Sequence, residues 1–413
     1  MSQSARLHLF QAFGIELEYM VVDKTTLVVN PIVDQLLKNE LGVIGSDFEN
    51  GLITWSNELV LHVVELKSTR PESNFNALEN AFADNIKRIN AHLERWNALL
   101  MPTAAHPFMN PLTETKLWPH DNNEIYHLYN KIFNCQGHGW SNLQSTHLNL
   151  PFYDDEEFSK LHAAVRIILP LLPALCASSP IFDGKPTHQL DTRLEYYKTN
   201  QSKIPSITGR VIPEAVFSKR NYLNTIYEKI KTDIRPYDPE NILDPVWVNS
   251  RGAIPRFDRG SIEIRIMDVQ ECPAADFAII ALVIELLKAM VNEKFASMDV
   301  QTKIKTDVLV SIFNESIVTG RQTVITDTDY LNLFGVTSAA SIQKLWATIL
   351  QRLVVISPTL EFWKKPELET ILTNGSLSER ILKYVGENPS AEKIKLAYRQ
   401  LSDCLAQNKM FLW

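Results

Sequence analysis

Four short stretches of the chain alternate between apolar and polar positions, as a strand with one buried face does. They are GIELE at 14–18, VVELK at 63–67, THLNL at 146–150 and IEIRI at 262–266. Since side chains at i and i+2 of a strand point to the same face, each stretch has one apolar face and one face of carboxylate, imidazole, amide or guanidinium groups. One such stretch is typical of a half-exposed strand. Four of them, rich in glutamate, predict a single sheet whose inner face is a charged site.

The full strands are expected at residues 13–23, 59–68, 146–152 and 261–269. Apolar residues recur every three or four positions over 73–100, which predicts a helix with Ser73 or Asn74 as its N-cap. A second helix is expected to begin at Asp154 or Asp155 and to end near residue 169, because prolines follow there.

The remaining chain divides into irregular and helical parts. Residues 101–145 mix prolines with polar aromatic residues and are expected to form loops over a site, and residues 183–258 are irregular and rich in Pro, Arg and Asn. After Asp276 the pattern is almost entirely helical, apart from a short extended piece near 321–326. Long helices between strands favour an α+β fold, with a mostly antiparallel sheet whose apolar back is covered by helices. The glutamate-bearing strands would then line a concave cavity, a usual place for a small-molecule site.

Composition excludes several classes of protein. A net charge of −7 without any basic tract argues against a nucleic-acid binder. The longest apolar runs are interrupted by proline or by charged residues, so no membrane span is expected, and the N-terminus lacks the pattern of a signal peptide. The cysteines lie far apart with no CxxC spacing, which predicts a reduced cytoplasmic protein without structural zinc; they are Cys135, Cys176, Cys272 and Cys404.

The polar faces contain an oxygen-dominated set of candidate metal ligands: Glu16, Glu18, Glu58, Glu65, Glu263 and one imidazole, His147. Hard oxygen ligands favour Mg²⁺ or Mn²⁺ over zinc, iron or copper. Divalent ions would also relieve the repulsion between carboxylates on one face. Mg²⁺ sites of this kind usually serve nucleotide phosphates, and Arg265 beside Glu263 supplies a fixed cation for a transferring phosphoryl group.

Each motif also has a plain structural interpretation. A lone Glu-x-Glu is usually a solvated strand face, Glu263 and Arg265 could be a surface ion pair, and Glu58 could be a loop residue. The chain has neither GxxxxGK[ST] nor GxGxxG, so any nucleotide must be held by metals, arginines and the sheet. The joint occurrence of the motifs favours a functional site, but residue types alone do not name a reaction.

Taken in order, these segments resemble glutamate–cysteine ligase family 2, in its carboxylate–amine ligase branch. The resemblance covers residues 12–290. It rests on FGIELEYMVVD at 13–23, the pair Glu58 and Glu65, AAHPF at 104–108, THLNLPF at 146–152, LPLLPALCASSPIFDG at 169–184 and RFDRGSIEIRIMDVQECPAADFAIIAL at 256–282.

The resemblance implies a glutamine-synthetase-like fold, a funnel of mostly antiparallel strands with helices outside. Residues 1–290 would form the catalytic core, and residues 291–413 a helical extension packed on it as one domain. It also implies a reaction in which ATP phosphorylates a substrate carboxylate and an amine displaces the phosphate to form an amide. The expected partners are therefore ATP, an amino-acid-like carboxylate and an amine, with a homo-oligomer left open.

By the same resemblance, one Mg²⁺ would be held by Glu16, His147 and Glu263, and another by Glu18, Glu58 and Glu65. Arg265, with Glu263, would act in catalysis by stabilising the phosphoryl group in flight. The expected contacts to nucleotide or substrate are Asn149, Lys67, Arg193 and Arg251, with Arg210 as a further candidate.

One position departs from the pattern. Many members of the branch have His-x-His, at what is counted there as the second strand, where this chain has His147-Leu148-Asn149. Asn149 resembles the glutamate–cysteine ligases proper. Two other functions stay open: a metal-dependent phosphotransferase of the same fold, and a catalytically idle relative that binds a ligand or partner. Three roles stay open for the C-terminal region: closing the cavity, contacting nucleotide, or forming an oligomer interface.

Overall fold

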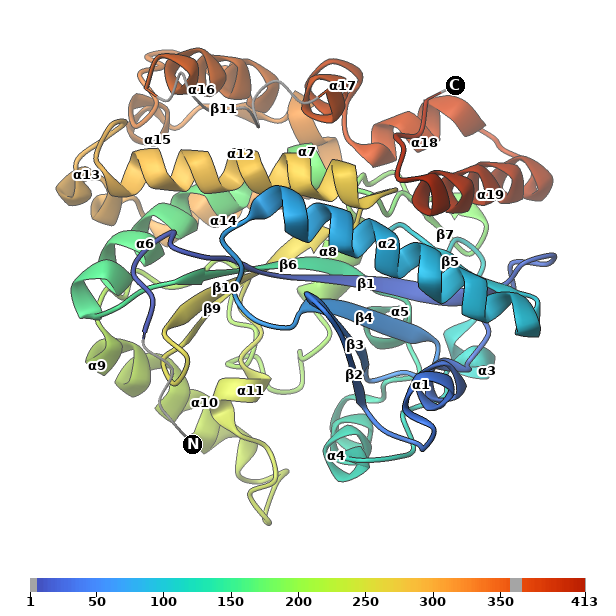
Figure 1. Ribbon diagram of the computed structural model, residues 1–413. Coiled ribbons are helices and arrows are strands. Elements are labelled where there is room, and N and C mark those ends of the chain that lie inside the picture. Colours follow the sequence, from blue (N-terminus) through green and yellow to red (C-terminus); the bar gives the residue numbers. More distant parts are fainter. Residues whose placement is uncertain (1–5, 357–365, 413) are drawn as a thin grey trace.

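The computed structural model describes residues 6–356 and 366–412. Its centre is an eight-stranded sheet in the order β2-β3-β4-β1-β6-β10-β9, with β5 pairing beside β1, and every neighbouring pair is antiparallel (Figure 1). The strands are β1 (Gly14–Asp23), β2 (Asp47–Asn50), β3 (Ile53–Asn57), β4 (Val63–Ser68), β5 (Ala98–Met101), β6 (Ser145–Pro151), β9 (Ala253–Arg256) and β10 (Ser261–Asp268). The predicted α+β class with a mostly antiparallel sheet is confirmed.

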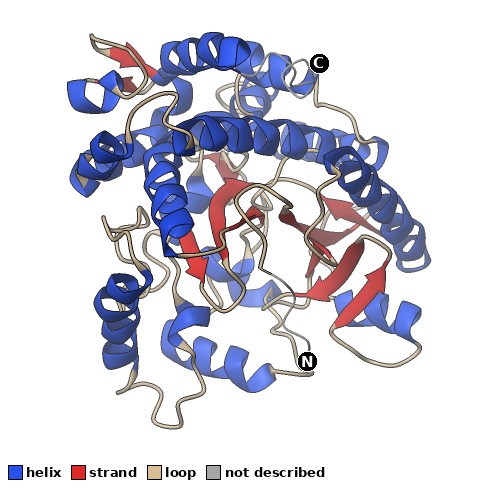
Figure 2. Cartoon of the chain, turned by 60° about the vertical axis from the view of Figure 1, so that its left-hand side comes forward, coloured by secondary structure: helices blue, strands red, loops and turns tan. Residues whose placement is uncertain are grey.

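Helices surround the strands (Figure 2). The long helices α2 (Phe75–Leu93) and α12 (Pro273–Val291) lie on one side of the sheet, while α4 (Asn123–Phe133) and α10 (Glu228–Ile234) lie on the other (Figure 1). The alternation in the strands explains this layering. The apolar positions, such as Ile15, Leu17, Leu148 and Ile264, are fully buried in one core together with Phe82 and Phe277 of the covering helices.

The strand and helix predictions are largely confirmed, with two corrections. The strand expected at 59–68 begins at Val63, after a turn. The helix expected over 73–100 is capped by Asn74 but ends at Leu93. Asn97 then takes a left-handed conformation, φ 50°, which no helix continues through, and the next four residues pair with β1 as β5. The apolar residues at 98–101 fit either the last turn of a helix or a buried strand, and the pairing with β1 makes them a strand.

Sequence patterns missed several short elements. The hairpin of β2 and β3 turns at Gly51, whose φ of 67° suits glycine. The irregular regions contain α4, β9, and α9 (Lys219–Tyr222), which continues through a π-helical turn (Leu223–Tyr227) into α10. The other short elements before α12 are α1 (Val33–Leu41), a 3₁₀ turn (Glu94–Trp96), α3 (Pro111–Glu114), α5 (His138–Ser141), a 3₁₀ turn (Leu169–Leu171), α7 (Pro173–Cys176), β7 (Ile181–Phe182), β8 (Lys185–Pro186), α8 (Thr192–Tyr197) and α11 (Pro245–Val248). The helix predicted from Asp154 or Asp155 to about residue 169 is confirmed as α6 (Asp155–Ile168), which Asp154 caps.

The C-terminal region is helical, as predicted, with the expected extended piece at β11 (Val324–Ile325), which pairs with β12 (Ala340–Ser341). The boundary predicted at residue 290 falls inside α12 and stays a prediction. The helices are α13 (Met298–Lys303), α14 (Thr306–Thr319), a 3₁₀ turn (Gly320–Gln322), α15 (Thr328–Asn332), α16 (Ile342–Ile356), α17 (Pro366–Asn374), α18 (Leu377–Val385) and α19 (Ala391–Gln407).

A fully buried ion pair joins this region to the core. Arg380 of α18 lies 2.5 Å from Glu271, which follows β10, and both side chains are 0% exposed. Arg380 also donates to the carbonyl of Phe411, and the Phe411 N–H donates to Glu271. Around it, Leu377, Ile381 and Leu401 pack against Met20 and Met101 in a second apolar cluster.

No helix in the described ranges is both long and apolar enough to span a bilayer. The most apolar one, α12, instead lies at the centre of the protein, with nearly all of its residues buried. All four cysteines are free.

We predict that Arg380→Met lowers the free energy of unfolding by about 3–5 kcal/mol, because it leaves Glu271 buried without a cation. Chemical denaturation measures this. Lys24→Met is the control. It breaks a pair whose side chains are 47% and 59% exposed, and a loss within about 1 kcal/mol is expected. Similar losses in the two variants would contradict the prediction.

Candidate active site

The polar residues of the four patterned strands lie opposite one another across the sheet. Glu16 of β1 is paired with His147 of β6 on one side and with Lys67 of β4 on the other. In the same way Glu18 is opposite Glu65, and Asn149 is opposite Glu263. Residues opposite each other in an antiparallel sheet share a face. The structure therefore brings the polar positions of all four strands onto one surface.

The tightest cluster on this surface is Glu16, His147 and Glu263. His147 Nδ1 lies 2.8 Å from Glu16 Oε2 and 3.9 Å from Glu263 Oε1. One ligand atom from each of the three residues lies within 4.8 Å of the other two. In the described part of the chain this is the one group of three or more such ligands at that spacing. A carboxylate–imidazole–carboxylate set of this size fits one divalent cation.

Burial and charge act against each other in this cluster. Burial would raise the pKa of Glu16, but the hydrogen bond and charge of His147, with Arg265 and Lys67, lower it to about 2. Burial would likewise lower the pKa of His147, yet the hydrogen bond and charge of Glu16 raise it. The contact with Glu16 thus favours the protonated form of the buried imidazole, which would place a positive charge between the two carboxylates.

A second group of carboxylates lies beside the first. Glu18 accepts hydrogen bonds from the backbone and hydroxyl of Ser145. Burial and the charge of Glu16 raise the pKa of Glu65 to about 7. Burial and the charges of Glu18 and Glu65 raise the pKa of Glu58 well above its usual range. These three carboxylates are thus close enough to repel one another, and their joint role as ligands of a second metal stays a prediction.

Two arginines flank Glu263. Arg265 Nε lies 3.0 Å from its Oε1, and Arg256 Nε donates to its Oε2 at 3.2 Å. The Arg265 Nε makes no aligned hydrogen bond within the described structure. Arg256 was not among the predicted site residues. Its position next to the Glu-x-Arg strand was the available signal, because β9 pairs with β10 through Ser261 and Arg256.

The polar surface forms one wall of a cavity of about 280 Å³. Glu18, Glu58, His147 and Arg265 reach it from the sheet side. Aromatic residues line it from the two regions that lacked clear patterns: Tyr126, Tyr129, Trp140, Tyr197 and Trp247. Tyr129 packs edge-on against both Trp140 and Trp247. Residues 101–145 therefore border the site, as expected; they do so through α4, α5 and the loops around them, and no described residue after 290 lines the cavity.

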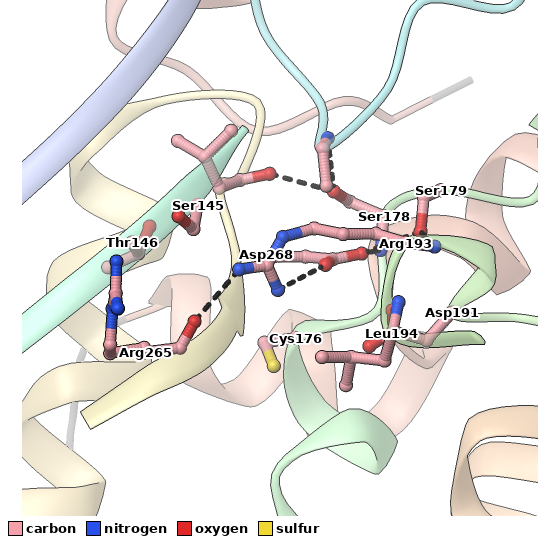
Figure 3. A network of polar contacts seen from close by, with 12 residues as sticks. Ser145, Thr146, Cys176, Ser178, Ser179, Asp191, Arg193, Leu194, Arg265 and Asp268 are labelled. Carbon is pink, nitrogen blue, oxygen red and sulfur yellow. Dashed lines mark hydrogen bonds and ion pairs between the residues drawn. The ribbon is translucent and has the colours of Figure 1, made fainter. Parts of the chain in front are cut away.

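The other predicted contacts are placed differently. Asn149 donates to Glu16 at 3.0 Å, and Lys67 lies 3.1 Å from both Glu65 and Asp47. Arg193 lines the cavity, but its guanidinium is bonded to Asp268 and to the carbonyl of Arg265 (Figure 3).

Arg251 and Arg210 are not brought to the cavity. Arg251 is 3% exposed and donates to both carboxylate oxygens of Glu214 at 2.6 Å, while Arg210 pairs with Asp307 on the surface. A nucleotide contact by either arginine has no support from these positions.

Comparison with known proteins identifies related chains. The family described as glutamate–cysteine ligase family 2 matches residues 12–312. A protein of Archaeoglobus fulgidus, described as uncharacterized, is 31% identical over 402 residues, which span 97% of this chain and 100% of that protein.

Two solved structures are also similar. A bifunctional glutathione synthetase from Pasteurella multocida has a TM-score of 0.56 at 13% identity over 97% of this chain. This chain spans about half of that protein, 52% of its length, and the likeness shows the fold alone. A structure of the complex between the ubiquitin-like protein Pup and its ligase PafA has a TM-score of 0.48 at 11% identity, over 97% of this chain and 76% of that one.

The raised pKa of Glu65 predicts a pH effect on stability. Because its folded-state pKa of about 7 lies above the ordinary value of 4.5, ionising this carboxylate destabilises the folded protein as pH rises between these values. With no divalent cation present, Glu65→Gln removes this loss. We expect the melting temperature of Glu65→Gln relative to the parent protein to increase between pH 4.5 and pH 7.

Glu392→Gln, at a side chain that is 80% exposed, is the control and should show no such trend. A difference between Glu65→Gln and the parent protein that stays constant with pH would contradict the prediction. Added Mg²⁺ at pH 8 should stabilise the parent protein more than Glu65→Gln.

Proposed function

The chain belongs to glutamate–cysteine ligase family 2, and from this premise we propose that it is a carboxylate–amine ligase that uses ATP and Mg²⁺ or Mn²⁺. ATP phosphorylates a substrate carboxylate, and an amine then displaces phosphate from the acyl phosphate to form an amide. The single observation that supports this best is the cluster of Glu16, His147 and Glu263, with Arg265 beside it, at the wall of an aromatic-lined cavity.

The donor atoms fit a hard divalent cation. Glu16, His147 and Glu263 would hold one ion, and Glu18, Glu58 and Glu65 a second. The high pKa of Glu58 and Glu65 without a cation supports this, because carboxylates that repel one another gain most from a shared positive charge. When bound, the ions would neutralise phosphate oxygens of the nucleotide.

The cationic side chains suit the first chemical step. A carboxylate oxygen of the substrate attacks the γ-phosphorus while the bond to ADP breaks, and charge spreads over the phosphoryl oxygens. Arg265 has one edge toward Glu263 and lines the cavity, so it can donate to these oxygens as the step proceeds. The pairing of Arg256 with Glu263 keeps that carboxylate oriented.

The aromatic wall suits the second step. An acyl phosphate is hydrolysed if water reaches it, so the amine must react in a site that excludes water. The edge-to-face packing of Tyr129 with Trp140 and Trp247 supplies apolar surface on this wall, which would limit the access of water once substrates are bound. The amine nitrogen then attacks the acyl carbon, and phosphate leaves.

The proposal is tested by ADP release from ATP with panels of amino acids, other carboxylates and amines. We expect release that requires both a carboxylate and an amine, is abolished by EDTA and is restored by Mg²⁺ or Mn²⁺. The product amide is identified by mass spectrometry. Release that needs a carboxylate or guanidino substrate but no amine would indicate a phosphotransferase. Absence of release from every mixture would contradict the enzyme assignment.

We predict that Arg265→Lys lowers kcat by about 10²-fold or more, since lysine keeps the charge but loses the planar pair of donors. The KM for ATP should change much less, because the metal ligands remain. Arg210→Lys, at the surface pair with Asp307, is the matched control and should leave kcat unchanged. If Arg265 only stabilises Glu263, Arg265→Lys would instead lower the melting temperature and leave kcat near its original value.

A further inference from the structure

Arg265 lies at an irregularity in its strand. The pairing of β10 with β6 shifts register between Ile264 and Met267, so Arg265 falls in a bulge outside the regular ladder. Its backbone is held from two sides: its N–H donates to the carbonyl of Gly252 at 2.9 Å, and its carbonyl accepts from Arg193 Nη2 at 2.8 Å. A bulge re-aims the side chain that it carries, and here an arginine side chain fixes the bulge.

Arg193 is itself held by a buried network (Figure 3). Its Nη1 lies 3.2 Å from Asp268 Oδ1, and the two side chains are 3% and 0% exposed. The second oxygen of Asp268 accepts from the Ser178 N–H at 2.8 Å and the Ser179 hydroxyl at 2.9 Å. The carboxylate therefore has partners on both oxygens, and the guanidinium has little freedom to move.

The start of α8 sets where Arg193 lies. Asp191 caps this helix by accepting from the Leu194 N–H at 3.0 Å, and the Arg193 N–H donates to the Ser179 hydroxyl at 3.0 Å. The same guanidinium lies 5.8 Å from the ring centroid of Tyr197, one turn further along. Tyr197 lines the cavity. Arg193 thus connects the segment around Ser179 to two residues of the cavity wall.

We propose that the Arg193–Asp268 pair is a positioning device for Arg265, holding the bulge of β10 so that the Arg265 guanidinium reaches the cavity. The role rests on the proposed function, in which Arg265 acts on the phosphoryl group. It differs from the direct nucleotide contact expected for Arg193 from the sequence. A buried ion pair is a costly way to obtain stability alone, because apolar residues of similar volume do as well or better. An apolar pair could not donate a hydrogen bond to the Arg265 carbonyl, as Arg193 does. This contact accounts for a charged pair at this position.

Arg193→Lys tests the proposal, because lysine keeps the charge but cannot reach Asp268 and the Arg265 carbonyl with two planar donors. We expect kcat to fall by about 10²-fold, the loss that a misplacement of about 1 Å produces, with a much smaller change in the KM for ATP. In the double variant with Arg265→Lys, kcat should be no lower than in Arg265→Lys alone, since Arg193 acts through Arg265. Multiplicative losses would overturn the proposal.

Arg166→Lys is the matched control. Arg166 is also fully buried and donates to a backbone carbonyl, that of Pro213 at 2.8 Å, but it does not line the cavity. Arg166→Lys should lower the melting temperature and leave kcat unchanged. If Arg193→Lys does not fold, Asp268→Asn, which keeps the side-chain size, takes its place with the same expected split between kcat and KM.

A crystal structure of the variant gives a readout independent of activity. We expect the Arg265 carbonyl and guanidinium to have moved. An Arg265 that keeps its place in the variant would overturn the positioning role. If the parent protein released no ADP from any mixture, that result would contradict only the proposed function, and the crystal structure would still test the positioning role.

Discussion

Repulsion between carboxylates on one face of a single sheet is the constraint to which the rest of the structure responds. Glu16, Glu18, Glu65 and Glu263 project from neighbouring strands, and at this distance unpaired negative charges would oppose folding. The fold places a positive or ionisable group between them: His147 between Glu16 and Glu263, Lys67 beside Glu65, and arginines on both sides of Glu263. Glu18, with Glu58 beside it, remains at the cavity wall.

The C-terminal region contributes at a distance from this surface. Ser378 of α18 donates its N–H to the Ala177 carbonyl and its hydroxyl to the Leu190 carbonyl. These carbonyls border the segments that contain Ser178, Ser179 and Asp191, and those residues hold Asp268 and α8. The buried pair of Arg380 and Glu271 fastens α18 beside them. A chain of contacts therefore runs from the C-terminal helices to the bulge of β10.

Sequence reasoning was effective for the strands in which apolar and polar residues alternate, because this alternation both buries one face and places the site residues on the other. The positions of Glu16, His147 and Glu263 on a shared face followed from strand periodicity, because the apolar partners in between had to be buried. Their catalytic and metal-binding roles stay predictions. Arg256 was missed because β9 has four residues, including a proline, and shows no alternation. The position of residues 101–145 over the site was predicted, but the helix that carries Tyr126 and Tyr129 was not, because its burial depends on the assembled cavity. Nothing in the local sequence distinguished Arg251, bound to Glu214, from an arginine that faces a ligand.

The shared alternation has a consequence for how such a protein diversifies. Loss or gain of one residue within β1 would exchange its faces, placing Glu16 and Glu18 in the core and Ile15 and Leu17 in the cavity. Evolution can thus alter these strands by substitution but scarcely by insertion or deletion. Residues 102–144 and 183–252 lie outside the central sheet and carry no such register, and they supply the wall opposite the sheet. New substrate preferences are therefore expected to arise by changes of length in these two segments, while the pairing register of the sheet stays the same.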